Sequence, residues 1–330
     1  MKTRADRLLT LDTMRQIHGA ARPRWVWTAC KLTQALFGPP RSVRVEFEGL
    51  DNLPAGPVIV AANHTHTYDF LPLRAFLFLR HHLFGSSWVK ARAWQNPVER
   101  YLFSRTGNVP LVSRGYVLAA DFLRLVGRRP TEAEYRALRN HLDRGDALPD
   151  DAVYAQVQDA ERHILGWSFT PSTSTYRDAI RDCFFEMMQV SLRIARESCE
   201  AGQFQHINPQ GARSSRLTEG KPGVIHASRA LDLAIVPTAI LGMTETFPNH
   251  GLKTRGGAIT IRFGEPYTPD LDALPESYRP FDPRITAACG ALLQQRTTEL
   301  MGKIDALCSE AYRFRSDFVC DATSGTARFL

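Results

Sequence analysis

Several patterns that would assign this sequence to a known class are absent. Its six cysteines include no Cys-x-x-Cys pair, which argues against a zinc ribbon or a thioredoxin-like motif. No Gly-x-Ser-x-Gly segment is present, so the nucleophile elbow of a serine hydrolase is missing. Internal repeats and low-complexity stretches are also absent, and 44% of the residues are hydrophobic. The composition therefore predicts a globular protein with a full core, in a reducing, cytoplasmic compartment.

The sequence also lacks a hydrophobic run long enough to cross a membrane. Its most apolar stretch, residues 70–84, is too short and is interrupted by Arg74, Arg80, His81 and His82. The first residues show no apolar segment typical of a signal peptide. We therefore expect a cytoplasmic protein that is soluble or lies peripherally on the inner face of a membrane.

Positive charge is concentrated at one end of the chain. The net charge is +7, and residues 1–45 carry all of this excess. Two tryptophans lie among these basic residues, a combination that suits the headgroup zone of a bilayer. We predict that residues 1–40 form an amphipathic hairpin of two helices, 5–19 and 23–37, that faces a membrane. A solvated basic helix packed on its own domain is the main alternative, and the aromatic residues argue against a nucleic acid partner.

Hydrophobic spacing predicts an α/β fold: a mixed, mostly parallel sheet with helices on both faces. Residues 42–48 alternate apolar and charged, which is typical of a half-buried strand. Residues 58–62 form a short apolar run after a turn, which is typical of a buried strand. Helical patterns separate the strands, as in crossover connections between parallel strands. Further strands are predicted at 86–91, 108–112, 203–208, 234–241 and 257–263.

One long segment departs from this alternation of strands and helices. Residues 116–200 have mostly helical spacing and no clear strand pattern. We therefore predict a large helical insertion within a single α/β domain of residues 41–313. Residues 314–330 show little patterning and are expected to form a tail.

A candidate catalytic pair follows the predicted strand at 58–62. His64 and Asp69 lie in a polar loop that leads into a helical pattern, and catalytic groups favour this carboxyl end of a strand. Acyl transfer to an alcohol needs a base that removes the hydroxyl proton, and a histidine titrates in a suitable range. A carboxylate on the other ring nitrogen fixes the tautomer and stabilises the imidazolium. We predict His64 as the general base and Asp69 as the residue that orients it.

Three further motifs follow this pair in order. The four segments are Asn63-His64-x4-Asp69, a segment 107–114 ending in Arg114 and preceded by a strand with Lys90, Pro209-Gln210-Gly211-Ala212-Arg213, and a strand with a proline at 235–240. Together they resemble the motifs of the glycerolipid acyltransferase family, which contains the lysophosphatidic acid acyltransferases. The resemblance covers roughly residues 40–115 and 200–265.

This resemblance implies an O-acyltransferase. It would move a fatty-acyl group from acyl-CoA or acyl carrier protein to a hydroxyl of a lysophospholipid-like or other lipid acceptor, with no cofactor beyond the thioester. The resemblance also implies a substrate-binding set in which the basic side chains hold an anionic head group. This set comprises Asn63, Lys90, Arg114, Gln210, Gly211 and Arg213.

Two positions depart from the family pattern. Gln210 stands where the family has glutamate, and Ala212 stands where it has threonine. A glutamine keeps an acceptor oxygen but loses the charge. An acceptor without glycerol phosphate, or a chain that only binds lipid, is therefore the alternative function.

A metal-dependent hydrolase is a more distant alternative. His64 and His66 form a His-x-His segment at a strand end, and Asp69 would supply a third ligand. However, Asp69 follows His66 by three positions, and the later histidines lack ligand spacing. We therefore predict no metal site.

Overall fold

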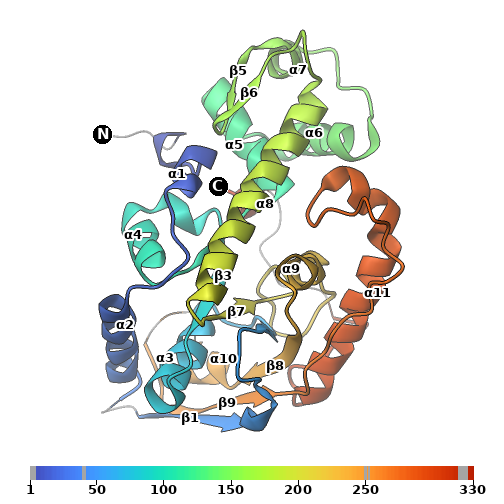
Figure 1. Cartoon of the computed structure of the whole chain (residues 1–330). Coiled ribbons are helices and arrows are strands. Elements are labelled where there is room, and N and C mark those ends of the chain that lie inside the picture. Colours follow the sequence, from blue (N-terminus) through green and yellow to red (C-terminus); the bar gives the residue numbers. More distant parts are fainter. Residues whose placement is uncertain (1–4, 39–41, 249–250, 252, 319–325) are drawn as a thin grey trace.

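The computed structural model describes residues 5–38, 42–248, 251, 253–318 and 326–330, and its central feature is a seven-stranded sheet (Figure 1). The strand order is β1-β9-β8-β2-β7-β3-β4. All neighbouring strands are parallel except β8 and β9, which are antiparallel. The fold is therefore the predicted mixed, mostly parallel α/β fold. The strands are β1 (Val43–Glu48), β2 (Ile59–Ala62), β3 (Gly85–Lys90), β4 (Val109–Leu111), β7 (Phe204–Ile207), β8 (Ile235–Leu241) and β9 (Gly257–Phe263).

Burial along the strands explains why each was recognisable in the sequence. The central strands β2 and β8 are buried at every position, which agrees with their continuous apolar runs. The edge strand β1 begins with alternating buried and exposed residues, which agrees with its alternating sequence. All seven predicted strands of the sheet are confirmed, with boundaries that differ by a residue or two.

Helices cover both faces of the sheet. Successive residues along a strand face opposite sides, so each strand contributes to the packing on both faces. On β7, Phe204 packs in a core cluster with residues of α3 (Phe70–His81), whereas Ile207 packs in a second cluster with α8 (Tyr176–Glu200). His206 therefore faces the α3 side, since alternate residues share a face. Helix α2 (Pro23–Leu36) packs on α3, while α9 (Gly223–Leu231) and α11 (Pro283–Leu307) lie on the α8 side (Figure 1).

The predicted insertion is helical but contains a β-hairpin, so the expectation of no strand was wrong. Strands β5 (Arg162–Ile164) and β6 (Trp167–Phe169) pair around a two-residue turn at Leu165 and Gly166. Both turn residues have positive φ, which usually requires glycine or asparagine. Because Leu165 occupies the first position of the turn, the sequence did not indicate a hairpin there. The insertion also contains α5 (Arg114–Val126), α6 (Glu132–Arg144), α7 (Ala152–Asp159) and α8.

The N-terminal residues form helices but no hairpin. Helix α1 spans only Leu11–Arg15 and packs on α8, whereas α2 packs on α3 (Figure 1). Leu9, Leu11 and Met14 are buried in the main core, so α1 belongs to the domain and presents no apolar face to a membrane. The two helices therefore do not pack on each other as the predicted hairpin, whereas the membrane-facing role of residues 1–40 stays a prediction. Residues 39–41 lie outside the described part.

The remaining short elements connect the layers. They are α4 (Pro97–Arg105), α10 (Met243–Thr246) and 3-10 turns at Ala5–Arg7, Leu50–Asn52, Ala93–Gln95 and Thr326–Arg328. In the predicted tail, residues 319–325 lie outside the described part. Phe329 packs on the Tyr135 ring at 5.3 Å and Leu330 is buried, so these last residues are anchored on the insertion.

Two further observations concern the whole described chain. Among the described residues, no helix combines the length and apolarity needed to span a membrane. The cysteines in the described part are all free of disulfides, namely Cys30, Cys183, Cys199, Cys289 and Cys308.

Candidate active site

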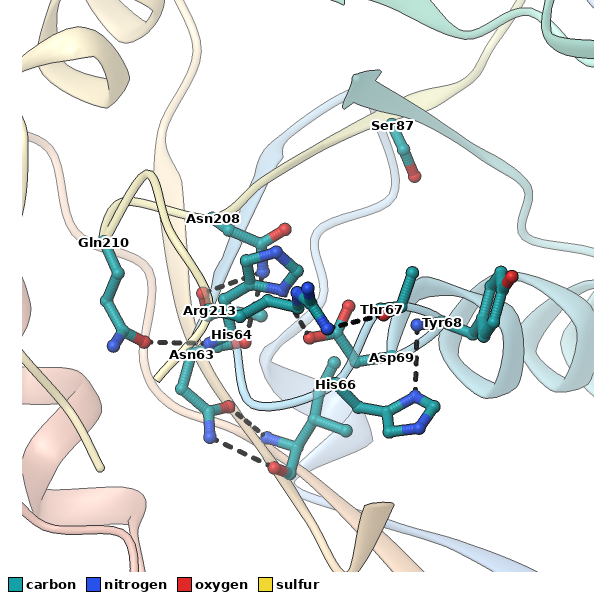
Figure 2. A network of polar contacts seen from close by, with 12 residues as sticks. Asn63, His64, His66, Thr67, Tyr68, Asp69, Ser87, Asn208, Gln210 and Arg213 are labelled. Carbon is teal, nitrogen blue, oxygen red and sulfur yellow. Dashed lines mark hydrogen bonds and ion pairs between the residues drawn. The ribbon is translucent and has the colours of Figure 1, made fainter. Parts of the chain in front are cut away.

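His64 and Asp69 are in direct contact in the loop between β2 and α3 (Figure 2). His64 Nδ1 lies 2.8 Å from Asp69 Oδ2. Asp69 occupies the N-cap position of α3, yet its carboxylate does not cap the helix, because it is directed to the histidine. Asp69 is buried, and the helix N-terminus favours its negative charge. With the Nδ1 proton donated to Asp69, the basic lone pair of His64 is on Nε2, the arrangement that a general base requires.

The backbone of His64 is held on both sides by the segment that follows β7. The His64 N–H donates to Gln210 Oε1 at 2.8 Å, and the His64 carbonyl accepts from the Ser214 N–H at 2.9 Å (Figure 2). Two segments that are nearly 150 residues apart in sequence are therefore joined at the candidate catalytic residue. This clamp fixes the position from which the imidazole projects.

Asparagine side chains complete the clamp. Asn63 forms two hydrogen bonds with the backbone of Ile240 on β8, donating at 3.1 Å and accepting at 2.7 Å (Figure 2). Asn208, which follows β7, donates to the carbonyls of Ala62 and Asn63 at 3.2 and 3.1 Å. The buried Asn63 thus joins the loop after β2 to β8, and its role as a substrate ligand stays a prediction. Asn208 was missed, although its place at the carboxyl end of a parallel strand was a usable signal.

Gln210 is also a scaffold residue. It is buried, its oxygen accepts from the His64 N–H, and its amide donates to Arg216 O and Thr218 Oγ1, both at 3.2 Å. Gln210 therefore supports the backbone of His64, and its contact with substrate stays a prediction. The neighbouring Gly211 has φ +69° and donates its N–H to Asn208 O, so this amide closes a turn and is not directed to a ligand.

Two predicted anion-binding residues lie close to the catalytic pair. Arg213 donates to Thr67 Oγ1 at 2.7 Å, inside the same loop as His64 and Asp69 (Figure 2). Lys90 ends β3, which is two strands away from β2 in the sheet, or roughly 10 Å. Burial lowers the pKa of Lys90, and the positive charge of Arg213 lowers this pKa further. Two cations close enough to influence each other form a suitable site for an anion.

Arg114 is placed differently from its prediction. It begins α5 after β4, three strands from β2 or roughly 14 Å. Its guanidinium pairs with Asp143 at 2.7 Å, and Asp143 also accepts from Arg139 at 2.6 Å. The insertion therefore supplies a carboxylate that Arg114 shares with Arg139. The structure does not bring this residue to the catalytic pair.

The structure does not bring the two histidine rings of the His-x-His segment together (Figure 2). The His66 ring points away from His64, and its Nδ1 accepts from the Tyr68 N–H at 3.1 Å (Figure 2). Within the described residues, no three His, Cys, Asp or Glu side chains are grouped to hold a metal. His66 instead lines a narrow apolar crevice beside the loop, with Phe37, Tyr68, Leu71, Met243 and Phe247. Of these, Leu71 lies on α3.

A buried polar layer that the sequence did not reveal lies on the α3 face of the sheet. His206 Nδ1 lies 3.2 Å from Ser87 Oγ, and burial lowers the pKa of His206 to about 4, an effect that the Asp69 charge opposes. Arg74 donates to Asn108 Oδ1 and Thr106 O, and burial lowers its pKa to about 10. At neutral pH this layer therefore holds a neutral histidine and a charged arginine behind the catalytic loop.

Comparison with known proteins agrees with this arrangement. Residues 44–144 match the family model described as Acyltransferase. The chain also aligns with the crystal structure of the 1-acyl-sn-glycerophosphate (LPA) acyltransferase PlsC from Thermotoga maritima, with 15% identity over 86% of this chain and 78% of that chain, and a TM-score of 0.42. No curated protein matches the sequence. Residues 44–144 are thus similar to an acyltransferase domain, and they contain the whole Asn-His-x4-Asp motif with its histidine and aspartate in contact.

Proposed function

We propose that this protein transfers a fatty-acyl group from a thioester of coenzyme A or acyl carrier protein to a hydroxyl of a lysophospholipid-like acceptor. The observation that carries the proposal is the contact of 2.8 Å between His64 Nδ1 and the buried carboxylate of Asp69. This contact leaves Nε2 of His64 as the basic nitrogen. The acyltransferase family match over residues 44–144 supports the reaction type.

The proposed reaction needs no covalent acyl-enzyme. His64 Nε2 takes the proton of the acceptor hydroxyl as its oxygen attacks the thioester carbonyl, which forms a tetrahedral oxyanion. Asp69 stabilises the imidazolium during this step. The intermediate then collapses, the carbon–sulfur bond breaks, and the leaving thiolate takes the proton from His64. General-base catalysis of this kind contributes about 10²–10⁴-fold to the rate.

The charges around the pair favour an acceptor with an anionic head group. Arg213 is fixed next to the catalytic loop by Thr67, and Lys90 lies close enough for Arg213 to lower its pKa. Gln210 is used within the scaffold, so its lack of charge is no argument against an anionic acceptor or against catalysis. We therefore keep a phosphate-bearing lysolipid as the first acceptor to test.

The proposal includes a peripheral position on the inner face of a membrane. Helix α2 has no acidic residue, and its Trp27 and Leu32 side chains are 56% and 68% exposed. Deleting residues 1–38 would be a poor test of this role, because Leu9, Leu11 and Met14 belong to the core. Point substitutions on α2 are the appropriate alternative.

The test is acyl transfer by purified protein from labelled acyl-CoA and acyl carrier protein to a panel of lysolipids. The His64→Ala variant should lose at least about 10²-fold in turnover. It should remain folded, although the buried Asp69 carboxylate loses its partner, which costs about 1–3 kcal/mol of stability. His163→Ala is the matched control, since His163 is exposed on the insertion hairpin. Equal turnover by His64→Ala and wild type would refute the mechanism. Lipid binding by wild type without any turnover would indicate a binding protein.

A further inference from the structure

Helix α4 carries an apolar stripe on its outer side. Val98, Tyr101 and Leu102 are 66%, 48% and 42% exposed. These residues have i, i+3, i+4 spacing, so they lie on one face of the helix. In a soluble protein, such a stripe normally faces the core. Here α4 has no fully buried residue, and Phe103, off the stripe, contacts the Trp94 ring at a centroid distance of 5.4 Å.

The stripe of α4 is continuous with the exposed face of α2. The rings of Trp25 and Tyr101 are in edge contact, with centroids 5.4 Å apart. The backbone N–H of Arg22, just before α2, donates to the carbonyl of Arg105, the last residue of α4, at 2.9 Å. Both helices lie at the same side of the molecule (Figure 1). We define the α2–α4 surface as the exposed apolar residues of both helices, namely Trp27, Leu32, Val98, Tyr101 and Leu102.

The charges around this surface are almost all positive. Lys31 lies over the Trp27 ring at 5.8 Å, and Arg105 lies over the Tyr101 ring at 4.9 Å. Arg24 is exposed on α2, which has no acidic residue. Glu99 is the acidic residue of α4, and its position in the sequence places it about 100° from Val98 and about 60° from Leu102, beside the stripe. A cationic rim around exposed apolar and aromatic side chains matches the chemistry of an anionic bilayer surface.

We propose that α4 is the second half of a membrane-binding surface, so that the protein docks through the α2–α4 surface on a bilayer that contains anionic phospholipid. Aromatic side chains with cations over their rings suit the headgroup region, while Val98 and Leu102 would enter the acyl boundary. A protein partner would be expected to match the cations with carboxylates at defined positions. The proposal deepens the peripheral position proposed above, but it does not depend on the acyl-transfer chemistry.

The experiment measures binding of the full chain to mixed phosphatidylcholine–phosphatidylglycerol vesicles by co-sedimentation. The double variant Val98→Glu/Leu102→Glu should lower the partition coefficient at least tenfold, since two apolar contacts are replaced by charges that the bilayer repels. Arg105→Gln should lower the same coefficient about fivefold, and less at high salt, where screening weakens the attraction. Phe314→Glu is the matched control, since Phe314 is another exposed aromatic residue, beyond α11.

Other readouts separate this proposal from the proposed function. Acyl transfer to an acceptor presented in detergent micelles should be unchanged in the double variant, and the melting temperature should stay at the wild-type value, because these side chains are exposed. Vesicle binding equal to wild type would overturn the proposal. Self-association that the double variant abolishes, without any loss of vesicle binding, would assign the surface to a second copy of the chain and would also overturn it.

Discussion

Replacing Gln210 by glutamate, the family residue, tests whether the side chain at position 210 supports the backbone of His64 or binds substrate. A carboxylate keeps the acceptor for the His64 N–H but loses both donors of the Gln210 amide. The Thr218 hydroxyl can rotate and donate to the new carboxylate, whereas the Arg216 carbonyl cannot. In this buried position, the Arg216 carbonyl oxygen would then face a lone pair of the introduced carboxylate.

The expected cost follows from that single unpaired carbonyl. A buried polar group that loses its partner costs about 1–3 kcal/mol. We therefore expect Gln210→Glu to lower the free energy of unfolding by about 2 kcal/mol at neutral pH. In a protein of this size, this corresponds to a decrease of roughly 4 °C in melting temperature. The exposed Gln156 on α7 provides the control, and Gln156→Glu should change neither quantity.

The penalty should also depend on pH in a defined direction. Burial and the facing Arg216 carbonyl oxygen raise the pKa of the introduced carboxyl group above its unfolded value of about 4.3. A raised folded-state pKa means that stability is lost as the pH rises, and that the penalty disappears where the group is protonated in both states. The difference between wild type and variant should therefore shrink from pH 7 toward pH 4 in urea denaturation. If the variant were as stable as wild type at pH 7 and had an altered KM for the acceptor, the supporting role would be refuted and position 210 would be assigned to substrate binding.

The remaining predictions concern buried histidines and the catalytic carboxylate. Burial lowers the pKa of His206 and of His226 to about 4, whereas an unfolded histidine titrates near 6.5, so the free energy of unfolding should fall by about 2 kcal/mol per histidine between pH 6.5 and pH 5. Denaturation of the double variant His206→Gln/His226→Gln should show a flatter pH profile, and a profile as steep as wild type would contradict the assignment. Asp69→Asn should leave acyl-donor binding intact but lower kcat about 10³–10⁴-fold, because the amide donates to Nδ1 and leaves the proton on Nε2. A loss of less than tenfold in single-turnover assays would argue against this pairing.

The strands of the sheet and the contact between His64 and Asp69 were predictable because their signals are local. The buried run at residues 58–62 and the polar loop after it place His64 at a strand end, and the structure brings Asp69 to it within five residues. The roles of Asn63, Gln210 and Arg114 were not predictable in the same way. Each depends on a partner far along the chain, namely Ile240, His64 and Asp143.

Arg114 illustrates this limit well. Its motif gives a cation after a strand, and a cation there is free to bind an anionic head group unless something neutralises it. Asp143 on α6, which belongs to the insertion, pairs with Arg114 and also with Arg139. Spacing within the motif carries no information about an insertion that folds back on it. Side chains supplied by the insertion therefore decide which family positions remain available to substrate.

The α2–α4 surface shows a related limit of what hydrophobic periodicity can predict. The spacing of Val98, Tyr101 and Leu102 indicates that α4 has an apolar side, but not on which side of the helix the rest of the protein lies. A sequence reading assigns such a stripe to the core, because most stripes are buried. Here Tyr101 contacts Trp25 at the surface, so the stripe extends the exposed face of α2. The concentration of charge in residues 1–45 indicated only the α2 half, since the other half depends on how α4 docks beside α2.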